Sequence, residues 1–532
     1  MRDLVCAVDV GTGSARAGIF DRTGRLLGRG EHPIAMNRPR ADHAEHDSED
    51  IWRAVCTAVR TARAAAAAPA GAIAGVGFDA TCSLVVRDTD GRQLGVSTDG
   101  EARWDTIVWL DHRALAEADE CTASGHRVLD HIGGVMSPEM QVPKLMWLKR
   151  NLPRTWDAAG HFFDLADFLT WRASGSTARS QCTLTAKWTY LPHAGGWACD
   201  FLAAVGLADL TARGGLPEAA SPVGARLGTL TREAADDLGL DTDCAVGAGL
   251  IDAFAGALGV IGGEGEDDVG RRLALIAGTS SCLMGFAREP IYVSGVWGPY
   301  LGAALPGHWV YEGGQSATGA LLDHVVRVHA AGGTPDARLH ARIVERIAVL
   351  RAEEGPRFGA GLNVLPDFHG NRSPLADPHA RGVISGLTLD ASFDGLCRLY
   401  FRTAVAIALG VRHILDHLRA SGVPAEALHV TGGHLRNPLL MELYADAAGC
   451  AVHEAGADDA MLLGTAMAAA AAAGFYPTLA DACRAMRPAL RRREPDPARR
   501  DGYERDYRIF LAMHEQRRAL AELEETPRPA RG

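Results

Sequence analysis

The sequence lacks the features that mark several classes of protein. No run of about 18 apolar residues occurs, because Pro69 interrupts the longest alanine-rich stretch, residues 62–74, and no membrane-spanning helix is expected. Acidic residues outnumber basic ones by 65 to 54, and the net charge of -11 argues against a general nucleic-acid-binding protein. The 11 cysteines form no CxxC pair, which predicts reduced thiols in a cytoplasmic protein. An apolar segment starts at Leu4, so no signal peptide is expected.

Two common nucleotide-binding signatures are also missing. The segment GTGSAR, residues 11–16, lacks the third glycine of a dinucleotide-binding fingerprint, and a second apolar strand follows where that fold needs a helix. No GxxxxGK followed by Ser or Thr occurs, which excludes a P-loop protein. Any nucleotide site must therefore be built from other turns.

The start of the chain predicts a strand meander followed by a helix. Apolar segments at residues 4–9, 16–21 and 25–30 are separated by short turns. Apolar residues at helical spacing follow Ser48, with Asp47 or Ser48 as the candidate cap. These segments predict a mixed α/β unit.

The opening pattern recurs in the second half. Residues 271–287 again contain an apolar strand, a Gly-Thr-Ser-Ser turn and a second strand. Because 532 residues are too many for one core, we expect a duplicated α/β domain with a nucleotide cleft between two lobes. The glycine-rich, acidic segment 262–270 is the predicted linker. The predicted divisions are residues 1–262, residues 271–475 and a helical tail, residues 476–532, docked on the second domain.

Both small-residue turns offer backbone N–H groups and hydroxyls to an anion with little steric obstruction. One such turn is equally typical of a plain tight hairpin, whereas two equivalent turns favour phosphate binding. Asp9 ends the first strand beside its turn. It either caps that turn or serves, directly or through water, as a ligand for the Mg²⁺ that accompanies a nucleotide.

Two later segments carry further candidates. Asp252 stands near the start of a predicted helix in the weakly charged stretch 246–262. An acid there complements the helix dipole, but a lone carboxylate among apolar and small residues is also a candidate general base. Near the C-terminal end, a strand ends at Gly432 and Gly433 and a helix starts near Asn437. A flat glycine turn of this kind lets adenine approach the backbone.

These four elements, in this order, resemble the FGGY carbohydrate kinases of the actin-like superfamily over residues 3–515. The segments most similar to the D-ribulokinase branch are FDATCSLVV, WLDHRA, GGVMSPEMQVPKLMWLK, ARSQCTLTAKWTY, EGGQSATG and PDFHGNRSPLAD. Xylulokinases and glycerol kinases carry different residues at the sugar-facing segments, whereas bacterial L-ribulokinases are close neighbours. The resemblance implies an α/β fold of two actin-like (ribonuclease H-like) domains with a nucleotide and sugar cleft between them.

The resemblance also implies roles for individual residues. Asp252 matches the catalytic base that deprotonates the sugar hydroxyl, and Asp9 and Asp252 match the acids at the Mg²⁺. The implied sugar-binding residues are Thr81, Asp111, Lys187, Asp252 and Glu312. The implied nucleotide contacts are Thr12, Gly13, Ser14 and Arg16 at the first phosphate turn, Gly278 and Thr279 at the second, and Gly319, Asp323, Gly433 and Asn437 beyond it. Some relatives carry glutamine at the position of Asp323.

The implied activity is the phosphorylation of D-ribulose to D-ribulose 5-phosphate, with ATP and Mg²⁺ as cofactors. The expected partner is a small-molecule sugar, without nucleic acid or membrane, and a homodimer is a family-level expectation. L-ribulose, D-xylulose or a pentitol such as ribitol are alternative substrates, because epimers differ by only a few hydrogen bonds. A nucleotide-gated scaffold on the same fold is the non-enzymatic alternative, although such a scaffold has no evident need for Lys187, Glu312 and Asp252.

Overall fold

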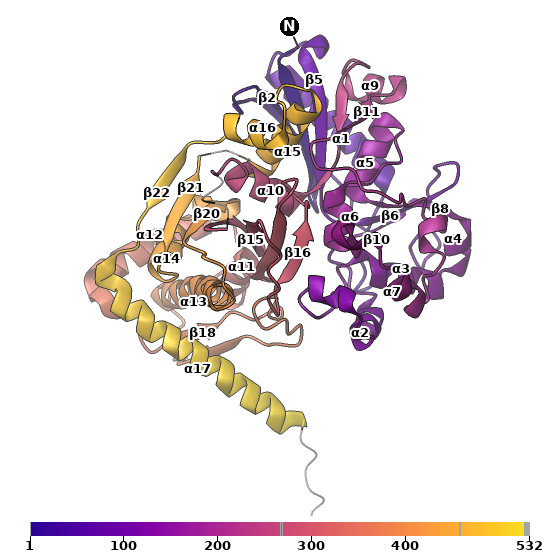
Figure 1. Cartoon of the computed structure of the whole chain (residues 1–532). Helices are drawn as coiled ribbons and strands as arrows, with labels where there is room; N and C mark the ends of the chain where they lie inside the picture. Colours follow the sequence, from indigo (N-terminus) through magenta and orange to yellow (C-terminus); the bar gives the residue numbers. More distant parts are fainter. Residues whose placement is uncertain (1, 266–267, 269, 457–458, 526–532) are drawn as a thin grey trace, which may run out of the picture.

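The computed structural model describes residues 2–265, 268, 270–456 and 459–525, which form two lobes with a seven-stranded sheet in each (Figure 1). The first sheet has the order β11-β12-β5-β1-β2-β3, and β13 pairs with β5 as the seventh strand. Its strands are β1 (Leu4–Val10), β2 (Ser14–Asp21), β3 (Leu26–Pro33), β5 (Ile73–Ala80), β11 (Arg226–Thr229), β12 (Ala245–Gly247) and β13 (Leu250–Ile251). The antiparallel β1, β2 and β3 confirm the predicted meander.

The second sheet repeats this plan in the order β16-β17-β15-β14-β20-β21-β22. Its strands are β14 (Arg272–Ala277), β15 (Ser281–Ala287), β16 (Trp297–Leu301), β17 (Trp309–Gln315), β20 (Ala427–Thr431), β21 (Ala451–Ala455) and β22 (Leu490–Arg493). In each sheet a strand pairs antiparallel with the next strand on one side, β1 with β2 and β14 with β15. On the other side, β1 pairs with the parallel strand β5, and β14 pairs with the parallel strand β20. The duplicated hairpin that the sequence predicts is therefore present.

Helices cover both sheets. α1 (Ser48–Ala65) packs on β3 and β2, and Asp47 caps it by accepting from the N–H groups of Glu49 and Asp50, as predicted. The approach of α1 requires Gly30, because a Cβ there would lie 2.2 Å from the Ala58 carbonyl oxygen. The helices that build the second lobe are α11 (Gly319–Val328), α12 (Ala337–Glu354), α13 (Phe393–Ala420) and α14 (Pro438–Asp446).

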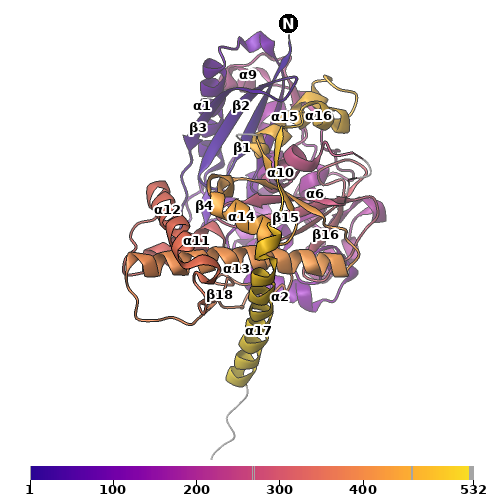
Figure 2. The same ribbon diagram turned by 90° about the vertical axis from the view of Figure 1, so that its left-hand side faces the viewer.

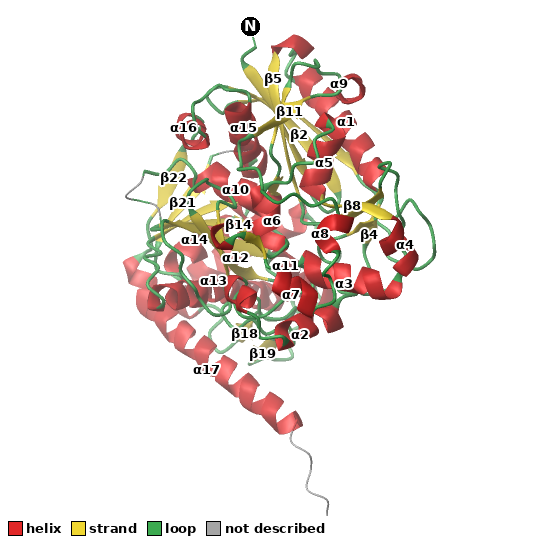
Figure 3. Cartoon of the chain, turned by 45° about the vertical axis from the view of Figure 1, so that its right-hand side comes forward, coloured by secondary structure: helices red, strands yellow, loops and turns green. Residues whose placement is uncertain are grey.

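A smaller sheet in the order β4-β7-β6-β8 extends the first lobe (Figure 3). Its strands are β4 (Glu45–His46), β6 (Leu84–Asp88), β7 (Thr106–Ile107) and β8 (Ala159–Asp164). The neighbouring helices are α2 (Leu115–Ala123), α3 (Gln141–Asn151), α4 (Pro153–Ala158), α5 (Leu165–Ser174), α6 (Gln181–Lys187), α7 (Cys199–Ala204), α8 (Leu210–Arg213) and α9 (Arg232–Leu238). No helix in the described ranges combines the length and the hydropathy that crossing a bilayer requires.

The C-terminal part of the chain is shared between the lobes. α15 (Ala460–Ala472) follows the second sheet in sequence but packs on β1, β5 and α10 (Asp252–Ile261) of the first lobe. The next segment, with α16 (Leu479–Ala485), stays there, and the Tyr476 hydroxyl donates to the Arg22 carbonyl oxygen. β22 and α17 (Arg500–Glu525) then return to the second lobe (Figure 2).

The tail prediction therefore needs a correction. Residues 476–485 belong with the first lobe, because α15 has already carried the chain back across. Only the later part docks on the second lobe, where Tyr503, Tyr507 and Phe510 of α17 join the core. Of the predicted linker, residues 266, 267 and 269 lie outside the described residues.

Candidate active site

Three aspartates meet where parallel strands of the first sheet end. Asp9 on β1 lies opposite Asp79 on β5 in the parallel register. β13 also runs parallel to β5, with Ile251 opposite Ala80, and Asp252 follows it as the first residue of α10. Because the carboxyl ends of parallel strands share one edge of a sheet, these side chains gather at that edge. The structure thus brings together Asp9 and Asp252 and adds Asp79.

Asp9 and Asp79 are buried and Asp252 is partly buried, a setting that disfavours the charged form of all three carboxyl groups. Burial raises the pKa of Asp9, Asp79 and Asp252, and repulsion from Asp252 adds to the increase at Asp9. Arg16 Nη1 donates a 2.9 Å hydrogen bond to Asp9 Oδ2 and opposes that increase. Thr465 donates to Asp79 Oδ2, and a side-chain hydrogen bond joins the carboxyl groups of Asp79 and Asp9.

This arrangement fits a divalent cation bound together with a nucleotide. Carboxylate oxygens are the ligands that Mg²⁺ prefers, and the carboxylates of Asp9 and Asp252 both line the cavity beside the phosphate turns. Within the described ranges, no three His, Cys, Asp or Glu side chains are placed to hold a metal ion by themselves. Mg²⁺ at a nucleotide site usually takes one or two carboxylates, and phosphates and water complete its coordination. The residues present match that second mode.

The two predicted phosphate turns are closed by similar hydrogen bonds. The Gly11 N–H donates to the Ser14 carbonyl oxygen at 3.0 Å, and the Gly278 N–H donates to the Ser280 carbonyl oxygen at 2.8 Å. Each bond folds the chain sharply after a strand, β1 in one lobe and β14 in the other. The turns therefore present backbone N–H groups and hydroxyls of both lobes.

A cavity of about 300 Å³ lies between the lobes and is lined by both turns. The predicted site residues that line it are Asp9, Thr12, Arg16, Thr81, Lys187, Asp252, Gly278, Thr279 and Glu312. This volume suits a small ligand. The cavity joins the predicted sugar residues to the predicted phosphate residues and to the candidate base.

The sugar end of the cavity holds a buried ion pair. Lys187, the last residue of α6, places its Nζ 3.8 Å from Glu312 Oε2 on β17, and both side chains are 4% exposed. Burial lowers the pKa of Lys187, but Glu312, together with smaller contributions from Cys82, Tyr300 and Glu139, raises the pKa overall. Glu312 Oε2 has no hydrogen-bond partner among the described residues, so it is ready to accept one from a sugar hydroxyl.

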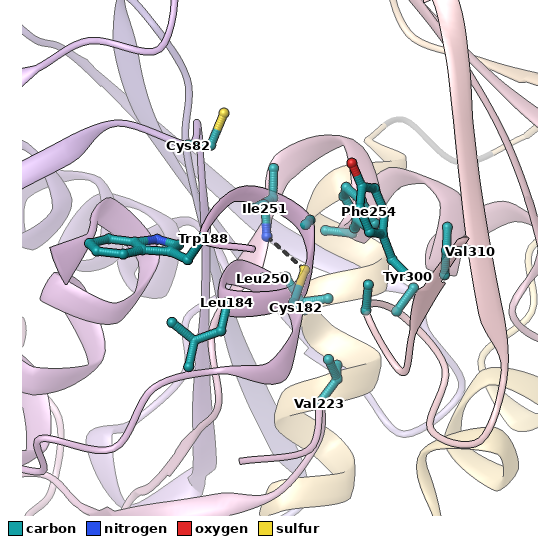
Figure 4. Close-up of a cluster of buried hydrophobic side chains, with 14 of the residues drawn as sticks. Cys82, Cys182, Leu184, Trp188, Val223, Leu250, Ile251, Phe254, Tyr300 and Val310 are labelled. Atoms are coloured by element: carbon teal, nitrogen blue, oxygen red, sulfur yellow. Dashed lines mark hydrogen bonds between the residues drawn. The ribbon is translucent and has the colours of Figure 1, made fainter. Parts of the chain in front are cut away.

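A packed apolar cluster contains Ile251 and Phe254, which line the cavity on either side of Asp252 in sequence (Figure 4). The Ile251 N–H donates to Cys182 Sγ at 3.4 Å, which ties the end of β13 to α6. Phe254 of α10 lies against Tyr300, with ring centroids 6.3 Å apart. Asp252 at the start of α10 and Lys187 at the end of α6 are thus held in place relative to each other by the hydrogen bond between Ile251 and Cys182.

Asp111 does not line this cavity. Its carboxylate is 0% exposed and accepts hydrogen bonds from the Arg113 guanidinium at 2.8 and 2.7 Å and from the Ala44 N–H at 2.6 Å. Arg113 also donates to Glu45 at 2.9 Å. Its oxygens therefore already accept hydrogen bonds from protein groups, and the predicted sugar contact of Asp111 stays a prediction.

Gly13 and Ser14 of the first turn also lie outside the cavity wall. The Ser14 hydroxyl donates to Glu31 at 2.9 Å, whereas a Cβ at Gly13 would meet nothing within 4 Å. Their contacts with a nucleotide stay predictions.

A hydrogen-bonded chain connects two predicted nucleotide residues of the second lobe. Asp323 Oδ1 is 2.8 Å from His340 Nε2, and His340 Nδ1 is 2.9 Å from the Tyr400 hydroxyl. Asn437 Nδ2 donates to the same hydroxyl at 3.3 Å, while its Oδ1 caps α14. Asp323 and Asn437 are therefore brought together, through two residues that the sequence analysis did not identify.

The glycines of this region let the backbone crowd the second phosphate turn. Gly432 has a φ of +90°, and a Cβ there would lie 2.5 Å from the Ala277 carbonyl oxygen. A Cβ at Gly319 would lie 2.6 Å from the Gly278 carbonyl oxygen. Only glycine fits at both positions. Gly433 follows directly and starts a short 3₁₀ turn, residues 433–436.

Sequence reasoning missed several residues at or beside the cavity. Trp109, Glu139 and Arg372 line it, and Asp79 adjoins Asp9. Asp79 ends an apolar strand as Asp9 does, which is a signal that could have found it. Trp109, Glu139 and Arg372 stand in segments that carry the family resemblance, but no local spacing indicates that they meet.

Comparisons with known proteins agree with this geometry. Models of the FGGY family of carbohydrate kinases match residues 4–259 as the N-terminal domain and residues 273–473 as the C-terminal domain. An FGGY carbohydrate kinase domain-containing protein of Homo sapiens is 43% identical over 96% of this chain and 96% of its own length. A D-ribulokinase of Saccharomyces cerevisiae is 37% identical over 87% of this chain and 71% of its own.

Solved structures share the fold. A xylulose kinase from Rhodospirillum rubrum superimposes with a TM-score of 0.77 at 23% identity, covering 97% of this chain and 99% of that one. Together with the family match, this confirms the predicted class, α/β with two actin-like (ribonuclease H-like) domains.

Proposed function

The chain belongs to the FGGY family of carbohydrate kinases, and we propose that it transfers the γ-phosphoryl group of ATP to D-ribulose, giving D-ribulose 5-phosphate. Family membership makes it a phosphotransferase with a sugar acceptor. The choice of D-ribulose is supported by the similarity to the yeast D-ribulokinase. The observation that carries the proposal is one cavity lined by Asp252, the Lys187–Glu312 pair and both phosphate turns.

In this proposal Asp252 accepts the proton of the attacking sugar hydroxyl. Its Oδ1 accepts a 2.7 Å hydrogen bond from the Ala253 N–H, and no described protein group donates to Oδ2. Oδ2 is therefore the atom that takes the proton. A positioned carboxylate of this kind typically contributes ~10²–10⁴-fold to the rate.

Lys187 and Glu312 hold the sugar so that the reacting hydroxyl reaches Asp252. The ammonium group suits a ketose carbonyl and the hydroxyls beside it, and the carboxylate accepts from a diol. Asp252 is electrostatically coupled to both groups, which supports a common substrate between them. Positioning is the main requirement of phosphoryl transfer, because the transition state needs little covalent help.

The two turns and the start of α10 bind and orient the phosphates. Thr12 and Thr279 offer hydroxyl donors from opposite lobes, and Gly278 lines the cavity beside Thr279. Asp252 begins α10, whose N-terminal dipole stabilises negative charge that develops on the transferred group. Gly319, Asp323, Gly433 and Asn437 are proposed to hold the rest of the nucleotide. Closure of the lobes would exclude water and suppress ATP hydrolysis.

Asp9 and Asp252, as predicted from the sequence, are the residues proposed to hold Mg²⁺, directly or through water. When bound, Mg²⁺ would supply positive charge that offsets the negative charge of the phosphates. Arg16 keeps Asp9 in place through their 2.9 Å hydrogen bond.

The test is ADP release in a coupled assay with Mg-ATP and a panel of D-ribulose, L-ribulose, D-xylulose and ribitol. A kcat/KM for D-ribulose at least about tenfold above the others, about 1.4 kcal/mol, supports the proposal. A higher value for another sugar would replace D-ribulose as the substrate. ADP release that no sugar increases would contradict a kinase and favour a nucleotide-gated scaffold.

A further inference from the structure

We propose that Arg372 and Glu139, an ion pair between the lobes, form a second sugar-binding element that binds the end of the sugar remote from the phosphorylated hydroxyl. Arg372 Nη2 lies 3.3 Å from Glu139 Oε1, and the side chains are 10% and 15% exposed. Both line the cavity between the lobes. The inference rests on the proposed function, because it concerns the sugar that the kinase phosphorylates.

The two residues come from different lobes and meet only in the folded chain. Glu139 stands just before α3 in the first lobe, and Arg372 stands in the irregular segment 366–378 of the second. His369 of that segment also stacks on His112 of the first lobe, with ring centroids 6.2 Å apart. The segment therefore bridges the lobes at two points beside the cavity.

The electrostatic neighbours indicate where the pair lies along the cavity. Asp252 interacts with Arg16 of the phosphate turn and with Lys187 and Glu312. Arg372 interacts with Glu139, Cys282 and Glu312, and its Nη1 lies 3.6 Å from Cys282 Sγ. Glu312 is thus shared between the base and Arg372. Arg16 of the phosphate turn acts on Asp252, whereas the closest contacts of Arg372 are Glu139 and Cys282, and this favours a place for Arg372 at the end of the cavity away from that turn.

The Trp297 ring contacts both cations of the sugar end, Lys187 and Arg372. Lys187 Nζ lies 4.4 Å and Arg372 Cζ 5.3 Å from the centroid of the Trp297 ring. Cys282 Sγ lies 3.6 Å from Glu312 Oε1 and so connects the Lys187–Glu312 pair to Arg372. The two ion pairs form one continuous polar wall.

The charges of this wall select an uncharged polyol. Lys187 is balanced by Glu312 and Arg372 by Glu139, so neither cation is left for an anionic sugar such as an aldonate. A guanidinium group has five N–H donors, and a carboxylate accepts through two oxygens. Together they can donate to and accept from one terminal hydroxyl. For D-ribulose phosphorylated at O5, that hydroxyl is O1.

The test compares D-ribulose with 1-deoxy-D-ribulose, which lacks only O1. Wild-type protein is expected to favour D-ribulose in kcat/KM by at least about tenfold, because a site built to bind a hydroxyl rejects an analogue without it. Arg372→Met and the isosteric Glu139→Gln are expected to lose activity on D-ribulose but not on 1-deoxy-D-ribulose. The ratio of the two kcat/KM values should then fall to about three or less. Arg372→Lys is expected to lie between. Arg346→Met, which removes an ion pair with Asp394 on the surface of the second lobe, is the matched control and should keep the wild-type ratio.

The outcomes separate this inference from the proposed function. Thermal unfolding and Mg-ATP binding show which variants are folded, and Glu139→Gln carries the test if Arg372→Met is not. The proposed sugar contact is overturned if the folded variants keep the wild-type ratio of kcat/KM values. It is also overturned if they lose activity equally on both sugars. If the wild-type protein phosphorylates a different sugar, D-ribulose is wrong as the proposed substrate. The kcat/KM ratio is then measured with that sugar and with its deoxy derivative, which lacks the terminal hydroxyl remote from the phosphate.

Discussion

Trp109 Nε1 donates a 3.0 Å hydrogen bond to Thr12 Oγ1, and this bond ties the wall of the sugar end to the first phosphate turn. Both residues line the same cavity, although 97 positions separate them. The bond therefore holds a ring of the cavity wall against a turn that is proposed to bind phosphate.

Trp109→Phe keeps most of the ring and removes the donor. We expect kcat/KM for ATP to fall about 2- to 12-fold, since a hydrogen bond of this kind is worth about 0.5–1.5 kcal/mol. Steady-state ADP release at saturating sugar measures the effect. Trp104→Phe, a buried ring in the same lobe that does not line the cavity, serves as the control. An unchanged kcat/KM for ATP in Trp109→Phe would show that the bond does not matter for nucleotide binding.

The Lys187–Glu312 pair should respond differently to its two truncations and to their combination. Glu312→Gln and Lys187→Met each leave a buried charge without its partner, which typically costs 3–5 kcal/mol in order of magnitude. We therefore expect both single variants to melt at a lower temperature and to show a raised KM for the sugar. The double variant should regain stability but not activity. Recovery of activity in the double variant would argue against sugar binding by the pair.

The pH dependence of turnover follows from the burial of Asp252. Burial raises its pKa, so it becomes protonated, and inactive as a base, at a higher pH than an exposed aspartate does. We expect kcat/KM for the sugar to fall with decreasing pH along a limb that lies above the ordinary aspartate value of about 3.9. Circular dichroism at the same pH values checks that the fold persists. An activity that stays flat down to pH of about 4 would contradict Asp252 as the base.

Asp164 offers a test of stability instead of activity. It is fully buried at the start of α5, and burial followed by repulsion from Asp167 raises its pKa to about 8. Between the unfolded value of about 3.9 and pH 8, the folded state holds a proton that the unfolded state has lost. The contribution of Asp164 to stability is therefore present at low pH and is lost as the pH rises through that window.

Asp164→Asn removes this titration. In the wild type Gln141 Nε2 donates a 3.0 Å hydrogen bond to Asp164 Oδ2, and the variant keeps this bond when its amide oxygen faces Gln141. Urea denaturation measures the free energy of unfolding of both proteins. We expect the value for Asp164→Asn to increase relative to the wild-type value as the pH rises from 5 to 8. Asp200→Asn, whose side chain is 64% exposed, is the control and should show a smaller trend. A constant difference across this range would mean that Asp164 is ionised throughout.

Local patterns were sufficient for the hairpins and for part of the site. Apolar segments with small-residue turns located β1, β2, β14 and β15, and a lone carboxylate at a helix start located Asp252. Such features depend on neighbours in sequence, so the sequence displays them. Family resemblance, and not spacing, supplied Lys187 and Glu312.

Long-range contacts were beyond the reach of the sequence. Glu139 and Arg372 are 233 positions apart, and neither stands in a periodic element that would indicate a partner. The return of α15 to the first lobe is equally hidden, because its alanine-rich surface fits either sheet. The surroundings of Asp111 were hidden as well, because its carboxylate accepts hydrogen bonds from Arg113 and from the N–H of Ala44, 67 positions away.

The most direct test of the account is sugar-dependent ADP release by Asp252→Asn compared with the wild type, with Mg-ATP binding measured on the same preparations. The variant keeps the size of the side chain and the Ala253 contact through its amide oxygen, and it lacks only a basic oxygen. The account predicts a loss of at least about 10²-fold in turnover with ATP binding largely intact. Turnover near the wild-type rate would contradict the assignment of Asp252 as the base, and with it the mechanism proposed for this cavity.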